Sequence, residues 1–276
     1  VPYHSADSYI ARLIAKGYKI AICEQTEDPA LAKGLVDRDI IRVVTPGTAM
    51  SASMLEDSKN NYICAIYGDS TAYGLCLCDI STGEVYASSF PAGEEGLGHL
   101  QNELARFHPA EAVLSSGAWN AEGLVPFLRD KLSCLCENGG EARFRIGAAR
   151  PLAEKQFQSG LTAVPPQDEA TIQAAGGLLA YLYETQKTDL SHISALTYYT
   201  AGQFMELDLT ARQTLELTAT MRGKEKRGSL LWVLDRTKTA MGGRLLRGWL
   251  ERPLLSPVQI ARRQQGVADL VEDAIT

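Results

Sequence analysis

The chain has 276 residues, 45% of them hydrophobic and 22% charged, and carries a formal net charge of −6. That is enough apolar material for more than one hydrophobic core at about 100–200 residues per domain, and no apolar run approaches the roughly 18 residues of a membrane span. Six cysteines are scattered through apolar runs, which excludes a disulfide scaffold and indicates reduced thiols in a cytoplasmic protein.

Residues 1–55 alternate helical and strand patterns. They predict a helix capped by Ser5, a buried strand over residues 18–23, a short helix that opens at Asp28-Pro29, and a second strand over residues 39–44. Four such elements are too few to close a core of their own. Because the chain also opens on Val rather than Met, we expect it to be a piece of a longer protein with further strands upstream.

Residues 56–165 begin with three strand patterns separated by two turn-forming triplets, Gly68-Asp69-Ser70 and Ser81-Thr82-Gly83. Turns this short join antiparallel neighbours, so the strands are expected to form two hairpins. A helix with an apolar stripe from Leu97 to Phe107 follows. The expected elements are strands over 62–67, 72–80 and 84–90, that helix, a strand over 112–114, a helix near 124–132 and a strand near 142–146.

Three antiparallel strands followed by alternating helices and strands are a ribonuclease-H-like layout, which makes a nuclease one hypothesis. Two-metal cleavage of a phosphodiester needs several carboxylates that converge on one site. Asp79 is the only acid well inside the strands, and we interpret it as an acceptor for backbone N–H groups of the adjacent turn. Cys76 and Cys78 share a strand face but lack the roughly four ligands of a zinc site, so we interpret them as core residues.

Residues 56–199 are strongly acidic, with eighteen acidic side chains against nine basic ones. Such an excess opposes a primary role in binding phosphates and favours a protein-facing surface. Glu94, Glu95 and Glu103 lie on the first predicted helix of this segment and are candidates for contact with a protein partner. A spacer that holds two neighbouring domains apart explains the segment equally well.

Pro165-Pro166 predicts a linker, because consecutive prolines exclude a helix. The region that follows is mainly helical in pattern, and Ala175-Gly176-Gly177 indicates a close contact in its first helix. The expected helices are one over 168–187, one capped by Thr237 or Thr239 and ended by Pro253, and a last one from about Pro257.

Basic side chains concentrate in residues 222–263, where eleven of them face three acidic ones. This block suits a nucleic acid or an acidic protein surface. The sequence contains no Gly-x4-Gly-Lys-Ser/Thr phosphate loop. The nearest likeness, Met241-Gly242-Gly243-Arg244, lacks the Lys-Ser/Thr ending, so its glycines are interpreted as positions of tight helix packing.

Two long stretches carry a family resemblance. Residues 1–48 read VPYHSADSYIARLIAKGYKIAICEQTEDPALAKGLVDRDIIRVVTPGT, and residues 234–254 read LDRTKTAMGGRLLRGWLERPL. The first is similar to the end of the mismatch-binding domain of the MutS family of DNA mismatch-repair proteins, and the second resembles that family's core domain. The two occur in the family's order, with plausible spacing between them.

The resemblance implies an α/β and α+β multidomain fragment. Residues 1–55 would be the C-terminal part of the mismatch-binding domain plus a linker, and residues 56–165 a ribonuclease-H-like connector domain. Residues 166–276 would start the mainly helical core, or lever, domain.

The same resemblance implies what the longer protein does. It would bind mispaired double-stranded DNA as a homodimer, signal repair to a MutL-type protein, and act as an ATPase with ATP and Mg. This chain is expected to contribute no catalytic, cofactor-binding or metal-binding residue. A protein-interaction module without its own DNA specificity and a ribonuclease-H-like nuclease are the alternatives.

Few residues are candidates for DNA contact. The family's mismatch-reading Phe-x-Glu motif is absent from residues 1–55, and Phe204-Met205-Glu206, in the core-like region, is interpreted as a strand with Phe204 buried. Arg38 and Arg42 lie four apart on a predicted strand and hence on one face. Contact with the DNA backbone and simple solvation remain open for both.

Overall fold

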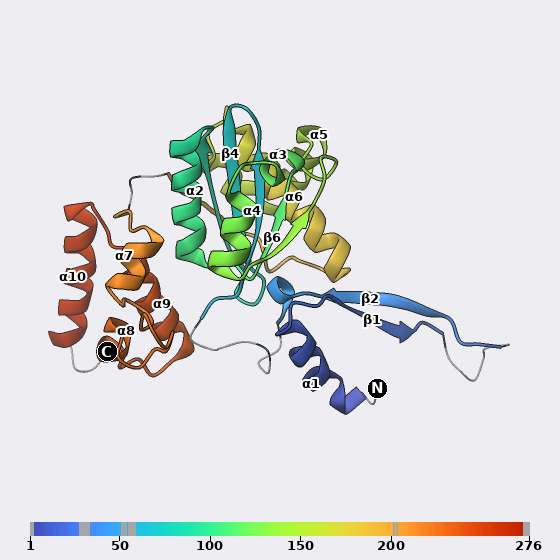
Figure 1. Ribbon diagram of the computed structural model, residues 1–276, viewed down its shortest axis with the longest axis horizontal. Coiled ribbons are helices and arrows are strands. Elements are labelled where there is room, and N and C mark those ends of the chain that lie inside the picture. The colour runs from blue at the N-terminus through green and yellow to red at the C-terminus, as the bar shows by residue number, and fades with distance from the viewer. Residues whose placement is uncertain are drawn as a thin grey trace. The chain divides into compact units, whose positions relative to one another are not determined.

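The computed structural model describes residues 3–27, 34–50, 54, 59–200, 202 and 204–272 (Figure 1). It divides into two compact units, Val1–Tyr198 and Tyr199–Thr276. The short helix expected at Asp28-Pro29 lies outside the described residues. The first unit contains α1 (Tyr3–Ile14), β1 (Ile20–Gln25), β2 (Arg38–Val44), the 3-10 turn η1 (Pro46–Thr48), β3 (Tyr62–Gly68), β4 (Ala72–Asp79), β5 (Glu84–Pro91), α2 (Glu94–Phe107), β6 (Glu111–Leu114), α3 (Ser116–Trp119), α4 (Leu124–Pro126), the π-helical turn η2 (Phe127–Lys131), β7 (Leu135–Asn138), α5 (Ile146–Phe157), the 3-10 turn η3 (Gln158–Ala163), α6 (Glu169–Gln186) and β8 (Leu196–Tyr198).

A six-stranded sheet in the order β7-β6-β3-β4-β5-β8 forms the centre of the first unit. The hairpins β3–β4 and β4–β5 are antiparallel, as the turn triplets predict, whereas β6 runs parallel to β3, β7 to β6 and β8 to β5. The three predicted hairpin strands and the strand at 112–114 are therefore confirmed. The result is a mixed α/β domain.

The strand expected near residues 142–146 is wrong. The strand is β7, and residues 142–146 lead through a turn into α5. Two apolar residues of this alternating pattern serve a turn instead of a strand: Phe144 is fully buried, and Ile146, the first residue of α5, packs against the core. Gly177 on α6 makes room for that ring, since a Cβ there would lie 2.5 Å from the nearest ring carbon.

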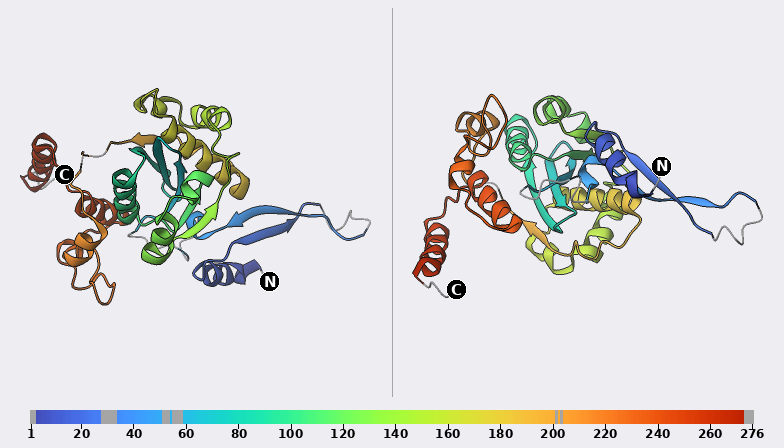
Figure 2. Two further views of the ribbon diagram at one scale, coloured as in Figure 1. Left: turned by 45° about the horizontal axis from the view of Figure 1, so that its top comes forward. Right: turned by 90° about the horizontal axis from the view of Figure 1, so that it is seen from below.

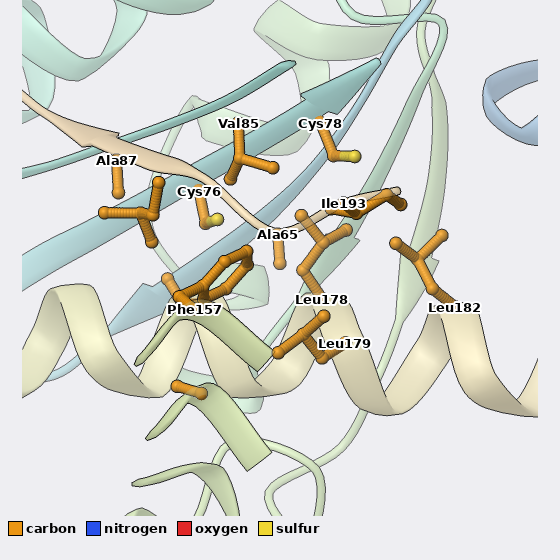
Figure 3. Close-up of a cluster of buried hydrophobic side chains, with 14 of the residues drawn as sticks. Ala65, Cys76, Cys78, Val85, Ala87, Phe157, Leu178, Leu179, Leu182 and Ile193 are labelled. Carbon is orange, nitrogen blue, oxygen red and sulfur yellow. The ribbon is translucent and has the colours of Figure 1, made fainter. Parts of the chain in front are cut away.

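Helices cover both faces of the six-stranded sheet (Figures 1 and 2). On one face α6 packs Leu178 and Leu182 against Cys76 and Cys78, whose assignment to the core is confirmed (Figure 3). On the other face α2 packs against β4 and β5, and its Phe107 ring meets Tyr62 edge-on at 5.1 Å between centroids. Burial on both faces explains why β3 and β4 read as nearly continuous apolar runs.

The long helix α6 belongs to the sheet, so the domain boundary expected at residue 166 is wrong. Its N-terminus is capped by Asp168, whose carboxylate accepts from the backbone N–H of Thr171 at 3.0 Å. Asp168 also accepts from the Ser89 hydroxyl of β5 at 2.7 Å. The two prolines before α6 mark a turn and not a domain boundary. The helix then packs its apolar residues against the sheet.

The hairpin of β1 and β2 is a separate two-stranded antiparallel sheet (Figure 1). The expectation of a buried strand is wrong, since most side chains of β1 are exposed. Among the described residues neither strand has a third partner. Apolar side chains therefore stay open to solvent, including Tyr18 at 59% and Ile40 at 40% exposure.

The described part of the second unit is mainly helical, and side chains cap the N-termini of its first three helices. The expected cap Thr239 is confirmed, because its hydroxyl accepts from Gly242 N–H at 3.0 Å. Phe204 is only half-buried and forms a single bridge with Leu254, so a strand there is wrong. The helices are α7 (Leu209–Thr214), α8 (Leu230–Leu234), α9 (Ala240–Glu251) and α10 (Pro257–Glu272). In neither unit does a described helix combine the length and apolar character needed to cross a membrane.

The approach of α6 to β4 supplies a test of this packing. A Cβ at Gly74 would lie 1.9 Å from the Ala170 carbonyl oxygen, so Gly74→Ala is expected to lower the free energy of unfolding by about 2–3 kcal/mol. Gly98→Ala is the matched control. Nothing lies within 4 Å of a Cβ there, inside α2, so it should stabilise by about 0.5–1 kcal/mol. Urea unfolding measures both, and equal effects of the two variants would contradict the packing.

Candidate functional site

A bulge in the hairpin separates the two candidate DNA contacts. Ile22 pairs with Arg42, but its neighbour Cys23 pairs with Ile40, so β2 carries one extra residue between the two arginines. An extra residue interrupts the alternation of side chains along a strand. The expectation that Arg38 and Arg42 share one face is therefore wrong.

The surroundings of the two arginines differ accordingly. Arg38 is exposed at the end of β2. Arg42 is half-buried, its guanidinium donates to the Thr48 carbonyl oxygen at 3.1 Å, and partial burial lowers its pKa. Arg38 is thus open to a phosphate, whereas Arg42 holds the turn that follows its own strand.

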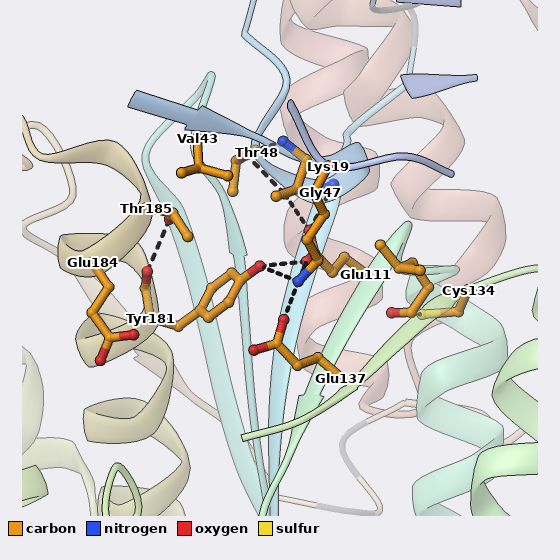
Figure 4. Close-up of polar contacts among 12 residues, drawn as sticks. Lys19, Val43, Gly47, Thr48, Glu111, Cys134, Glu137, Tyr181, Glu184 and Thr185 are labelled. Carbon is orange, nitrogen blue, oxygen red and sulfur yellow. Dashed lines mark hydrogen bonds and ion pairs between the residues drawn. The ribbon is translucent and has the colours of Figure 1, made fainter. Parts of the chain in front are cut away.

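A buried carboxylate lies where the hairpin meets the sheet (Figure 4). Glu111, on β6, has no exposed surface. Its carboxylate accepts from the Thr45 hydroxyl, from Gly47 N–H at 3.2 Å and from the Tyr181 hydroxyl at 2.6 Å. Lys19, just before β1, places its ammonium 3.4 Å from the same group. A buried charge needs such compensation, and three of these four partners come from the hairpin side.

Tyr181 extends this network from α6. Burial and the neighbouring Glu111 raise the pKa of its phenol well above the ordinary value, which keeps the hydroxyl protonated and able to donate. The same oxygen accepts from Lys19 at 2.9 Å. Lys19 also pairs with Glu137 of β7, so one lysine engages β6, β7 and α6 together.

The C-terminal end of α6 makes a second attachment to the hairpin. The Gln186 side-chain amide donates to the Val43 carbonyl oxygen at 3.3 Å, and the Lys187 ammonium donates to that of Ile40 at 2.7 Å. Our reading of the sequence missed all of these residues. The one available signal was Glu111 itself, an acid at the head of a short apolar strand.

The three acids proposed for partner contact are not equivalent. Glu94 and Glu95 are exposed on the first turn of α2. Glu103 is not a surface acid, because its side chain is 17% exposed and pairs at 2.8 Å with Arg106, which is 4% exposed. Treating Glu103 as a freely reversible surface charge is therefore wrong.

Asp79 performs the structural task assigned to it. Its carboxylate accepts from Asn61 N–H at 3.1 Å and from both the N–H and the hydroxyl of Ser81, at 2.9 and 2.6 Å. All of these bonds stabilise the ends of β3 and β4. Within the described residues no group of three or more His, Cys, Asp or Glu side chains is arranged to hold a metal ion.

Comparison with known proteins places these features in a family. Family models for MutS domain I, MutS domain II and MutS domain III match residues 1–53, 61–194 and 210–276, in that order. Proteins named DNA mismatch repair protein MutS from Ruminiclostridium cellulolyticum and Acetivibrio thermocellus are each 44% identical over 98% and 99% of this chain. The chain covers 31% of the length of each relative.

The matches define a chain of consecutive domains from the DNA mismatch-repair class of proteins. The chain belongs to the MutS family. The domain II match ends at residue 194 and so contains the whole of α6, in agreement with the packing of that helix on the sheet.

Charge reversal on α2 should separate the paired acid from the exposed one. Glu103→Lys leaves the buried Arg106 beside a like charge and is expected to lower the free energy of unfolding by about 3 kcal/mol. Glu94→Lys alters only the helix-terminus electrostatics and should cost less than about 1 kcal/mol. Thermal and urea unfolding report the difference, and equal losses would refute a buried pair.

The raised pKa of Tyr181 predicts how stability varies with pH. The unfolded phenol ionises near its ordinary value of 10.0, while the folded one keeps its proton, so its contribution is complete below pH 10 and is lost above it. Relative to Tyr181→Phe, the parent chain should lose up to about 1.4 kcal/mol per pH unit above pH 10. The buried cysteine thiols are the same in both proteins, so they do not contribute to the difference in stability between them. Urea unfolding between pH 8 and 11 measures the divergence, and parallel curves would show an unshifted phenol.

Proposed function

We propose that the chain forms part of a protein that recognises mispaired double-stranded DNA and signals repair. The observation that carries this proposal is the unbroken order of MutS domains I, II and III along the chain. Relatives that match nearly the whole of this chain are named DNA mismatch repair protein MutS. On this proposal residues 1–53 contribute to the DNA-binding end and residues 61–194 form a connector between it and the core.

The connector is, on the same proposal, ribonuclease-H-like. Its first three strands are antiparallel neighbours, and the next two add in parallel beside the first of them, which supports that assignment. A nuclease function receives no support, because Asp79 is committed to backbone and hydroxyl donors of its own turn.

Arg38 is the proposed contact with the DNA backbone. It is exposed on a hairpin whose neighbouring side chains are also open to solvent. The bond from Arg42 to Thr48 and the partial burial of its side chain support a structural role there instead. Glu94 and Glu95 remain the proposed contact with a MutL-type partner.

The activities of the longer protein follow from the family. On this proposal the longer protein is cytoplasmic, works as a homodimer and hydrolyses ATP with Mg at a site in another part of its sequence. Since this sequence contains no phosphate loop, the present chain is proposed to contribute none of that chemistry.

DNA titrations test the proposal directly. The chain should bind duplex DNA weakly and with strong salt dependence, and equally for a homoduplex and a G·T duplex, because the base-reading motif is absent and only backbone contacts remain. Arg38→Gln should reduce the slope of log affinity against log salt by about one.

Lys155→Gln provides the matched control, since it removes one exposed positive charge from α5. It should leave the salt slope unchanged. A reproducible preference for the mispair would show a base-reading element in this chain. Absence of duplex binding at low salt, in a folded chain, would instead favour a protein-interaction module.

A further inference from the structure

We propose that Glu111 and α6 form a joint that fixes the β1–β2 hairpin on the connector sheet, so that hairpin and sheet move as one body. The functional role of this joint rests on the proposed role in DNA recognition, whereas the attachment of the hairpin to the sheet does not. The joint consists of two attachments, one at the buried carboxylate and one at the C-terminal end of α6. Glu111 acts in it as a positioning residue.

The first attachment depends on hairpin residues that approach from both strands. Lys19 precedes β1, while Thr45 and Gly47 follow β2, and all three contact Glu111. Figure 4 shows Lys19 and Gly47 beside that carboxylate. The fit at the turn is close, because a Cβ on Gly47 would lie 2.8 Å from the Cβ atoms of both Glu111 and Ile63. A group engaged by both strands holds the base of the hairpin, where a single contact would permit rotation.

The second attachment is a set of hydrogen bonds to the backbone of β2. Gln186 and Lys187 donate hydrogen bonds to the carbonyl oxygens of Val43 and Ile40. Both residues belong to β2 and precede the turn that contacts Glu111. Lys187 also lies 3.9 Å from the Asp39 carboxylate. Because the two attachments lie at separate places along β2 and the turn after it, together they prevent the hairpin from rotating relative to the six-stranded sheet.

The helix α6 connects the joint to the opposite edge of the sheet, where β5 and β8 lie. The helix has 18 residues and is therefore about 27 Å long. Tyr181, Gln186 and Lys187 contact the hairpin region near its C-terminal end, whereas Asp168, at its N-terminus, accepts from Ser89 of β5 and from Tyr198 of β8 at 3.2 Å. A displacement of the hairpin is thus transmitted along a packed helix to the β5–β8 edge.

Distance measurements between spin labels test the joint on the whole chain. Cys23 is exposed on β1 and accepts one label, and Lys155→Cys on α5 accepts the other, in a Cys136→Ser background with the remaining cysteines buried. The parent distribution should be narrow. Lys19→Met with Lys187→Met removes a cation from each attachment, and the width should then increase by about twofold or more, since an unattached hairpin samples local opening.

Matched variants separate the joint from general effects. Lys16→Met with Lys131→Met removes two exposed lysines outside the joint and should leave the width unchanged. Lys19→Arg with Lys187→Arg keeps both cations and should give the narrow distribution of the parent. A second label pair within the connector, at Glu122→Cys and Lys155→Cys with Cys23→Ser, shows whether the sheet itself remains folded.

Each outcome decides the inference. A broadened hairpin distance with an unchanged connector distance supports the joint, while an unchanged hairpin distance overturns it. If the connector distance also broadens, Tyr181→Phe replaces the double variant, because it removes only hydrogen bonds within the network, and the same two results apply. No DNA enters the measurement, so failure of duplex binding would leave this result standing. A hairpin distance that stays narrow in Lys19→Met with Lys187→Met, in a chain that binds DNA, would overturn the joint alone.

Discussion

A carboxylate without exposed surface constrains the first unit of this protein. Removing a charge from water is costly unless other groups neutralise it and satisfy its hydrogen-bonding capacity. Glu111 obtains that compensation largely from residues that flank the β1–β2 hairpin, with Tyr181 added from α6. The hairpin is otherwise poorly anchored, since most of its side chains are exposed. Its placement on the sheet therefore depends on a polar network, together with the buried side chain of Val44 at the end of β2.

Sequence patterns predicted those elements whose signals are local. The hairpins of β3, β4 and β5 follow from turn triplets and apolar runs, and the capping of α9 by Thr239 follows from a residue adjacent to the helix. The boundary at residue 166 failed because prolines report a turn but not what packs after it. The alternation near Phe144 failed for a similar reason, since Phe144 and Ile146 alternate with polar neighbours and so imitate a strand over a short window.

The candidate site was less predictable, because long-range pairing decides which charges face solvent. The acidic excess of residues 56–199 suggested a uniformly acidic exterior. Several of those acids are occupied inside the structure: Glu111 in the joint, Asp79 at a turn and Glu103 against Arg106. On β2 a single extra residue separates the environments of two arginines that look equivalent in the sequence. A charge count cannot distinguish these cases, since each depends on how deeply the folded chain buries the side chain and its partner, or on strand register.

The last strand of the first unit, β8, is also connected to α6. β8 (Leu196–Tyr198) lies between the residues matched by the domain II and domain III models, yet it pairs in parallel with β5. The segment that leads towards domain III is thus part of the connector sheet before the second unit begins at Tyr199. The Tyr198 hydroxyl donates to Asp168, so this segment contacts the N-terminus of the helix whose other end contacts the hairpin. One helix therefore links the β1–β2 hairpin to the β5–β8 edge of the sheet through polar contacts at its two ends.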